Sequence, residues 1–114
     1  AGTAGGFSEL GACIGDVYLS TKCIFHARRI PLCLPGEQGN VSYFKEKHFE
    51  EYGFGHFRSP PLFHLAKRIG VKQGIVSSSD CLDCSEIDLQ LLRSEGAVVK
   101  EMEAAAVAWV CQVL

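Results

Sequence analysis

The stretch Lys-Glu-Met-Glu-Ala-Ala-Ala at residues 100–106 joins two segments of different character. Residues 97–100 begin with Ala-Val-Val, a short apolar run typical of a buried strand. Residues 103–114 are apolar almost all round, so we predict a helix that lies inside the fold. The Glu-Met-Glu turn therefore falls at the carboxyl end of a strand, where open α/β sheets bind their ligands.

Three further segments have the composition of strands. In residues 13–25, β-branched and aromatic residues alternate with polar ones, and Gly15-Asp16 marks the turn that leads into the strand. Residues 28–34 predict a weaker strand, which Pro31 confines to a sheet edge or to an irregular extended segment. Residues 72–77 predict a short strand.

Two further helices are bounded by capping signals. We expect Ser59 to cap a helix that has Pro60 at its first position and ends at Gly70. The apolar stripe of this helix consists of Leu62, Leu65, Ala66 and Ile69. Ser85, with an acid three residues later, predicts a second helix that runs to about Arg93. Its buried face carries Ile87 and Leu91.

This order of strands and helices predicts a layered α/β fold rather than a helix bundle or a sandwich of sheets. Residues 35–58 interrupt the order with a loop rich in glycine and aromatic residues. A loop of this length in a compact domain is often functional, and a surface insertion held down by its aromatic residues is an equal alternative. At 114 residues, the chain is one domain or part of one.

Charge and hydropathy exclude several partners. The net charge is −2 and no run of Lys and Arg could neutralise phosphates, so we expect no nucleic acid partner. No apolar stretch approaches the roughly 18 residues of a membrane span, so we expect no membrane partner. The chain opens with glycines rather than with a secretory signal, and we expect a cytoplasmic protein.

The chain has six cysteines. Cys13, Cys23 and Cys111 lie in apolar segments, where free cysteine behaves as a small hydrophobic residue, so we expect them to be reduced and buried. Cys81 and Cys84 form a Cys-x-x-Cys pair. A structural zinc site requires four ligands and the chain has no second pair, so we expect no metal.

The Glu-Met-Glu turn has two explanations. Carboxylates in the first turn of a helix are stabilised by the unpaired amides and the helix dipole, which requires no ligand. A carboxylate also offers two acceptor oxygens, which match the two hydroxyl donors of a ribose diol. The position at the end of a strand favours a ligand. We expect the Glu101 side chain to point away from Glu103.

A second candidate segment is the glycine turn Gly-Thr-Ala-Gly-Gly-Phe at residues 2–7. Its spacing does not match the dinucleotide-binding fingerprint, and no following helix is obvious. Glycine is the default residue of strained turns, so one explanation is purely structural. The other is that the turn lets the backbone approach a small polar ligand closely.

The two segments resemble the nucleoside phosphorylase/hydrolase family, and most of all the plant-type 5′-methylthioadenosine/S-adenosylhomocysteine nucleosidases. The resemblance implies a three-layer α/β/α sandwich with a central mixed sheet, incomplete at both ends, in which residues 1–114 form a single partial domain. It implies that Glu103 grips the ribose hydroxyls and that Met102 lies against the sugar. Contacts with the sugar or the nucleophilic water are implied for Thr3, Ala4 and Gly5.

Two more segments carry the resemblance. Residues 79–85, Ser-Asp-Cys-Leu-Asp-Cys-Ser, are similar to the family's Gly-Asp-Ser-Leu-Asp-Met-Ser, which borders the adenine. This similarity implies that Leu82 packs on the base and that the backbone near Leu82 and Asp83 hydrogen-bonds to its edge. Residues 24–31 are similar to the family's Phe-His-Asp-Arg-Arg-Ile-Pro, with Ala27 in place of the aspartate, and we assign His26 no catalytic role.

The resemblance implies a homodimer of methionine salvage that hydrolyses 5′-methylthioadenosine, with S-adenosylhomocysteine as a further substrate, and needs no cofactor. The family takes its water-activating glutamate from upstream of the glycine turn and its adenine-protonating aspartate from the strand after the Met-Glu helix. The catalytic residues are therefore expected outside these 114 residues, in a complete enzyme of which the chain is a fragment. The alternatives are a purine or uridine nucleoside phosphorylase and a non-catalytic nucleoside-binding remnant.

Overall fold

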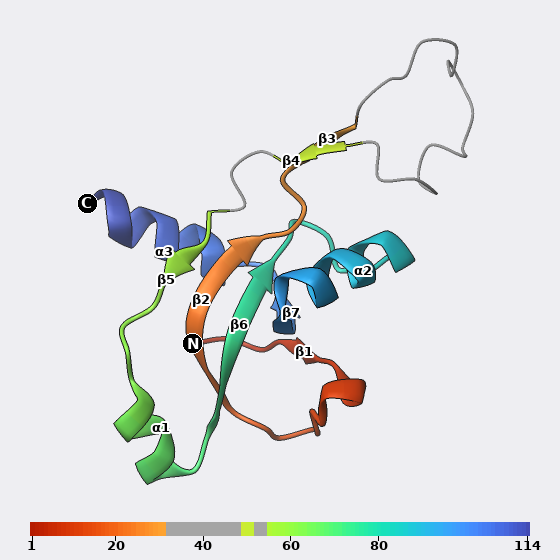
Figure 1. Cartoon of the computed structure of the whole chain (residues 1–114). Helices are drawn as coiled ribbons and strands as arrows, with labels where there is room; N and C mark the ends of the chain where they lie inside the picture. Colours follow the sequence, from red (N-terminus) through yellow and green to blue (C-terminus); the bar gives the residue numbers. More distant parts are fainter. Residues whose placement is uncertain (32–48, 52–54) are drawn as a thin grey trace, which may run out of the picture.

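The computed structural model of the chain describes residues 1–31, 49–51 and 55–114. Its centre is a five-stranded mixed sheet in the order β1-β7-β6-β2-β5 (Figure 1). The three inner strands run parallel to one another and are β2 (Tyr18–Phe25), β6 (Lys72–Ser78) and β7 (Ala97–Glu101). The two edge strands are antiparallel to their neighbours and are β1 (Gly5–Gly6) and β5 (Phe57–Arg58).

Three α-helices accompany this sheet: α1 (Phe63–Ile69), α2 (Glu86–Glu95) and α3 (Ala104–Val113). Helix α2 connects β6 to β7 and contacts β7, whereas α3 follows β7 and contacts β2, β5 and β6. A short 3₁₀ helix, η1 (Ser8–Leu10), follows β1. The predicted α/β/α architecture with a mixed central sheet is confirmed.

A separate two-stranded sheet pairs β3 (Arg29–Pro31) with β4 (Phe49–Glu51). The strand predicted at residues 28–34 is confirmed for its first part, and residues 32–34 lie outside the described residues. The loop predicted at residues 35–58 is wrong at β4 and β5. Its remaining residues, apart from Gly55 and His56, lie outside the described part of the chain.

The core lies between the sheet and the start of α3. Its central cluster consists of Cys23, Phe57, Val76, Val99 and Ala105. Phe57 meets Phe25 edge to face, with ring centroids 6.0 Å apart. The two-residue strand β5 is therefore held by a buried aromatic ring as well as by its pairing with β2.

The predicted strands and helices around β6 are confirmed. Helix α1 ends at Gly70, whose φ of 71° is the left-handed conformation that favours glycine. Helix α2 begins with the predicted capping box, in which the Ser85 hydroxyl accepts the Asp88 N–H and the Asp88 carboxylate accepts the Ser85 N–H. Leu91 is buried as predicted, and Leu92 beside it is buried too.

The predicted start of α1 is wrong. The helix begins at Phe63, and Ser59 instead donates its N–H to the Thr21 carbonyl and its hydroxyl to Ser20 Oγ. Pro60 and Pro61 explain the difference, because a residue that precedes proline is pushed out of the helical region. Of the predicted apolar stripe, only Ala66 is buried.

The prediction that the helix at residues 103–114 lies inside the fold is also wrong for the described residues. Ala105 is buried, but Val107, Val110 and Val113 are 60%, 49% and 68% exposed. The side chains of α3 that pack on the sheet are those of Ala104, Ala105 and Ala108. Among the five described cysteines, all are free, but only Cys23 is buried, so the predicted burial of Cys13 and Cys111 is wrong.

No helix in the described part of the chain is long and apolar enough to span a membrane.

Candidate nucleoside site

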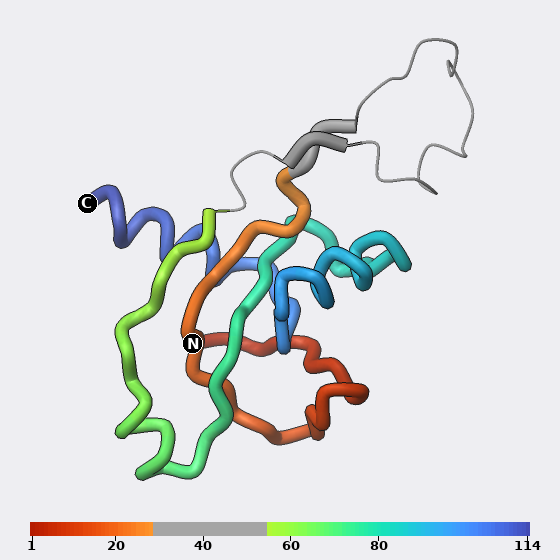
Figure 2. The backbone as a smooth tube through the Cα atoms, viewed as in Figure 1, coloured from red at the N-terminus to blue at the C-terminus, as the bar shows by residue number. Residues whose placement is uncertain are grey.

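The carboxyl ends of β6 and β7 lie side by side, and Ser78 pairs with Glu101 in their parallel register. The turn that carries Glu101, Met102 and Glu103 leads directly from β7 into α3. The first residues of the chain approach the same place because Gly5 lies opposite Lys100 in the antiparallel pairing of β1 with β7. Figure 2 shows the N-terminal segment, in red, passing beside the blue trace of β7. The glutamate turn and the glycine turn, at opposite ends of the sequence, therefore meet at one edge of the sheet.

Glu101 binds the start of α3. Its Oε2 accepts the backbone N–H of Glu103 at 2.8 Å and that of Ala104 at 2.7 Å. Its Oε1 accepts the hydroxyl of Ser78. The expectation that Glu101 points away from Glu103 is wrong, because the first helical amides attract its carboxylate.

Ser78 completes this network. Its side chain is buried at the end of β6, and its Oγ accepts the N–H of Ala105 at 2.8 Å while its own hydrogen goes to Glu101. Three consecutive backbone amides at the start of α3 therefore have acceptors supplied by two strands. Helix stabilisation was one explanation for the glutamate turn, and the structure assigns that role to Glu101 with Ser78.

Glu103 has no such role. It occupies the N-cap position of α3, yet its side chain makes no capping hydrogen bond. Its carboxylate is exposed, and no hydrogen bond or ion pair joins it to the described residues. Met102 beside it is 42% exposed. Both acceptor oxygens of Glu103 are thus available to a ligand at the end of β7.

The loop that carries Leu82 and Asp83 follows β6 and is tied to β7. Lys100 Nζ donates to the carbonyl oxygens of Cys81 and Leu82 at 2.7 and 3.0 Å. Ser79 binds the same loop through its hydroxyl, which donates to the Cys81 carbonyl at 2.8 Å. Leu82 itself is 84% exposed and contributes an apolar side chain to the open edge.

Thr3, Ala4 and Gly5 are exposed. All seven residues proposed from the sequence are therefore on exposed positions of this sheet edge or of the loops beside it. Ser78 and Lys100 were not predicted from the sequence as parts of the site, and the predicted direction of the Glu101 side chain was wrong. The signal available was the run of three serines at residues 77–79, where a strand ends beside a glutamate turn.

Two other polar residues considered from the sequence, His26 and Cys84, lie outside the glutamate turn. His26 is buried, and its Nδ1 lies 2.8 Å from Ser77 Oγ. Desolvation, followed by the nearby Asp88 carboxylate, raises the pKa of Cys84 above its ordinary value, so its thiol is protonated at neutral pH. The thiolate, which is the nucleophilic form of cysteine, is therefore disfavoured. Among the described residues, no group of three or more His, Cys, Asp and Glu side chains is arranged to hold a metal.

A shallow cleft lies elsewhere, between η1, α2 and the start of β7. Its lining includes Ala97, the first residue of β7, whereas Glu103 lies beyond the last residue of this strand. The cleft and the glutamate turn therefore occupy opposite ends of β7. The candidate residues at the glutamate turn are therefore separate from this cleft and lie on an exposed surface.

The fold and this edge of polar side chains define an α/β protein of the nucleoside phosphorylase and nucleosidase type. A family model described as the phosphorylase superfamily matches residues 1–114. The chain belongs to this superfamily.

Two relatives from Arabidopsis thaliana place the similarity more finely. A 5′-methylthioadenosine/S-adenosylhomocysteine nucleosidase is 38% identical over 113 residues, which are 99% of this chain and 39% of that protein. A 5′-methylthioadenosine nucleosidase is 39% identical over 114 residues, which are 100% of this chain and 38% of that protein. The chain thus spans about two fifths of the length of the curated relatives it matches, and the resemblance to plant-type nucleosidases is confirmed.

Solved structures of nucleosidases are also similar to this chain. The apo structure of the 5′-methylthioadenosine nucleosidase from Arabidopsis thaliana has a TM-score of 0.67 at 37% identity, over 98% of this chain and 40% of that one. A 5′-methylthioadenosine/S-adenosylhomocysteine nucleosidase from Neisseria meningitidis, in complex with methylthio-immucillin-A, has a TM-score of 0.61 at 27% identity. The match covers 96% of this chain and 47% of that structure.

Proposed function

We propose that the protein containing this chain hydrolyses the N-glycosidic bond of 5′-methylthioadenosine, and of S-adenosylhomocysteine as a further substrate. The names of the relatives support this substrate class. The observation that carries the proposal is the exposed Glu103 carboxylate, which has no partner among the described residues although three helical amides lie next to it. Those amides already have other acceptors, so Glu103 remains available for a ribose diol.

In the proposed reaction, the bond between the ribose C1′ and the adenine nitrogen breaks, and its electron pair leaves with the base. The base takes up a proton, and water adds to C1′ and loses a proton. The ribose is cationic in the transition state, and a carboxylate that binds its hydroxyls stabilises the developing charge. Glu103 has this role, Met102 lies against the sugar, and Leu82 packs on the base.

The Thr3 hydroxyl and the neighbouring amides of Ala4 and Gly5 contribute polar groups near the sugar or the water. The groups that activate the water and protonate the adenine come from parts of the protein beyond these 114 residues. This chain matches about two fifths of the length of the curated relatives, so these groups can lie in the part that corresponds to the other three fifths. On the same resemblance, we propose a cytoplasmic homodimer that acts in methionine salvage, and the mass of the native assembly tests the dimer.

A phosphorylase would attack C1′ with phosphate instead of water. Adenine release from 5′-methylthioadenosine by the native protein separates these reactions. We expect the same rate with and without phosphate. Activity that requires phosphate would replace this proposal with a phosphorylase, and binding without turnover would favour a non-catalytic nucleoside-binding protein.

The residue test compares Glu103→Gln with Glu86→Gln. Glu86 is a matched control because it also lies at the N-terminal end of a helix, as the first residue of α2, and its side chain is 69% exposed, with only an exposed ion pair to Arg93 at 3.7 Å. Loss of charged hydrogen bonds to the diol predicts a fall of about 100-fold in kcat/KM for Glu103→Gln. Glu86→Gln should change kcat/KM by less than about twofold, because exposed charges contribute little. Equal values for the two variants would refute the ribose role of Glu103.

A further inference from the structure

A network of hydrogen bonds at the candidate site binds the backbone of Glu103 and of the two residues after it, and leaves the Glu103 carboxylate out. Glu101 holds the N–H groups of Glu103 and Ala104, and Ser78 holds that of Ala105. We infer that Ser78 and Glu101 are positioning residues that fix the Glu103 carboxylate for diol binding. This inference rests on the proposed function.

The network fixes where the Glu103 backbone lies. Ser78 is the last residue of β6 and Glu101 the last residue of β7, and the two are paired in the sheet. Because their side chains bind three consecutive amides, the turn from β7 into α3 is tied to two neighbouring strands. Because the backbone is fixed, ligand binding has to order only the rotamers of the Glu103 side chain. This lowers the conformational entropy that is lost on binding.

The network also removes one competing interaction. The side chain of an N-cap residue ordinarily accepts the N–H two or three positions further on. Glu103 is the N-cap residue of α3, and Ala105 lies two positions further on. Since Ser78 occupies the Ala105 N–H at 2.8 Å, that amide does not draw the Glu103 carboxylate away from a ligand.

The chemistry of the two partners predicts what their loss does. In Ser78→Ala, the Ala105 N–H loses its acceptor, and the Glu103 carboxylate is the nearest replacement cap by position. In Glu101→Gln, the amide oxygen can still accept the two backbone N–H groups. However, its NH₂ group cannot accept the Ser78 hydroxyl hydrogen and can only donate to Ser78 Oγ, so that hydrogen loses its acceptor and the negative charge that binds the helical amides is lost. Both changes should impair diol recognition more than they impair folding.

The test uses the native protein and two probes, 5′-methylthioadenosine and its 2′-deoxy analogue. The readout is the ratio of their kcat/KM values. This ratio does not depend on the concentration of active enzyme, so partial unfolding of a variant leaves it unchanged. We expect the wild-type preference for the ribose substrate to fall at least tenfold in Ser78→Ala and in Glu101→Gln. Either variant suffices if the other fails to fold.

A double variant, Ser78→Ala in the Glu103→Ala protein, tests whether Ser78→Ala lowers the substrate ratio by acting through Glu103. If it does, adding Ser78→Ala to Glu103→Ala should leave the ratio where Glu103→Ala alone puts it, because coupled residues are not additive. Binding of adenine, which has no diol, should be unchanged in Ser78→Ala. A further drop in the ratio, or a parallel loss of adenine binding, would overturn the positioning role.

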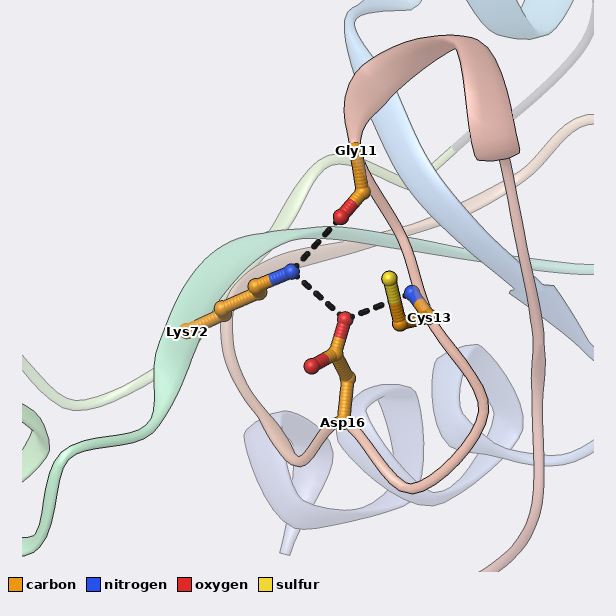
Figure 3. A network of polar contacts seen from close by, with 4 residues as sticks. All are labelled: Gly11, Cys13, Asp16 and Lys72. Atoms are coloured by element: carbon orange, nitrogen blue, oxygen red, sulfur yellow. Dashed lines mark hydrogen bonds and ion pairs between the residues drawn. The ribbon is translucent and has the colours of Figure 1, made fainter.

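Asp16→Asn is the matched control. The Asp16 carboxylate also accepts a backbone N–H, that of Cys13 at 2.8 Å, and it binds Lys72 at the opposite end of β6 (Figure 3). This variant should lower the melting temperature without changing the substrate ratio. If the native protein releases no adenine from 5′-methylthioadenosine, the proposed function fails. If Glu103→Ala itself retains the wild-type ratio, the ribose role of Glu103 fails and the positioning inference fails with it. If Glu103→Ala loses the preference but Ser78→Ala and Glu101→Gln retain it, only the positioning inference fails.

Discussion

The Lys100 ammonium group donates a hydrogen bond to the carbonyl oxygen of Leu82 at 3.0 Å, and so connects the last part of β7 to the loop after β6. The next residue along β7, Glu101, binds the start of α3. Successive residues of a strand point to opposite faces of the sheet. Two adjacent side chains therefore fix the two segments between which the proposed ligand lies.

Lys100→Met should loosen the Leu82 loop. Methionine keeps most of the aliphatic stem but removes both charged hydrogen bonds, which contribute modestly at an exposed position. We expect faster hydrogen exchange at residues 81–84 and a KM for 5′-methylthioadenosine about threefold to tenfold higher. Inhibition by adenine should weaken by a similar factor, in contrast to Ser78→Ala, if this loop borders the base as proposed.

Lys67→Met is the control for this prediction, since Lys67 lies in the last turn of α1 and is exposed. It should change neither hydrogen exchange at residues 81–84 nor the KM. The adenine role of the loop is contradicted if Lys100→Met accelerates exchange but leaves the inhibition constant of adenine at its wild-type value.

Gly74→Ala should destabilise the sheet between β6 and β7. A Cβ at this position would lie 2.1 Å from Val98 Cγ2, well inside van der Waals contact. Overpacking of this kind costs about 1–3 kcal/mol. Denaturant unfolding should give this loss for Gly74→Ala, and Val98→Ala added to it should recover part of the stability because it removes the clashing methyl groups.

Gly2→Ala is the matched control for a glycine substitution, because a Cβ there meets nothing within 4 Å. It should leave the free energy of unfolding within about 0.5 kcal/mol of the wild type. If Val98→Ala gives no recovery in the Gly74→Ala background, steric overlap is not the cause of the loss.

The parts of the fold that could be predicted from sequence have short-range causes. The capping box of Ser85 and Asp88 and the left-handed Gly70 each depend on a few neighbouring residues, and both were predicted correctly. Strand β5 was missed because its two residues are held by pairing with β2 and by the buried ring of Phe57. Such long-range pairing leaves no periodic pattern in a two-residue segment.

The same distinction between short-range and long-range causes applies to the candidate site. The position of Glu103 at the end of a strand followed from the apolar segments on either side of it. The role of Glu101 did not, because it depends on the register that brings Ser78 beside it from a different strand. The apolar composition of residues 104–113 indicated a buried helix, but composition does not say which other segments cover a helix.

The Asp16–Lys72 pair should make stability depend on pH at both extremes. The Lys72 hydrogen bond and then the Cys13 N–H hold the pKa of Asp16 below its ordinary value of 3.8. Its contribution is therefore present above pH 3.8 and is lost as the pH falls through the lowered pKa. The Asp16 hydrogen bond raises the pKa of Lys72 above 10.5, so this contribution is present below pH 10.5 and is lost as the pH rises through the raised pKa.

Melting temperatures of the wild type and of Lys72→Met, measured from pH 2 to pH 12, check this prediction. The difference between the two proteins should be largest between about pH 4 and pH 10 and should shrink toward both extremes. Added salt should reduce it, because the pair is partly exposed. A difference that stays constant across the whole pH range would mean that packing, and not charge, is what Lys72 contributes.

The isolated 114-residue chain should self-associate through α3. Val107, Val110 and Leu114 recur at intervals of three and four residues, so they form one apolar stripe, and they are 60%, 49% and 100% exposed. Trp109 is not counted in this stripe, because the Arg28 guanidinium lies over its ring, with Cζ 4.8 Å from the ring centroid. Exposed apolar stripes of this kind favour association over the monomer.

Sedimentation velocity of Val107→Lys/Val110→Glu should show a larger monomer fraction than the unmodified chain at the same concentration. The two opposite charges leave the net charge unchanged, so a general increase in repulsion does not account for the effect. Val17→Lys is the control, because Val17 is 58% exposed but lies in the segment before β2. A chain that is monomeric without substitution, with a sharp thermal transition independent of concentration in circular dichroism, would show that this stripe does not drive association.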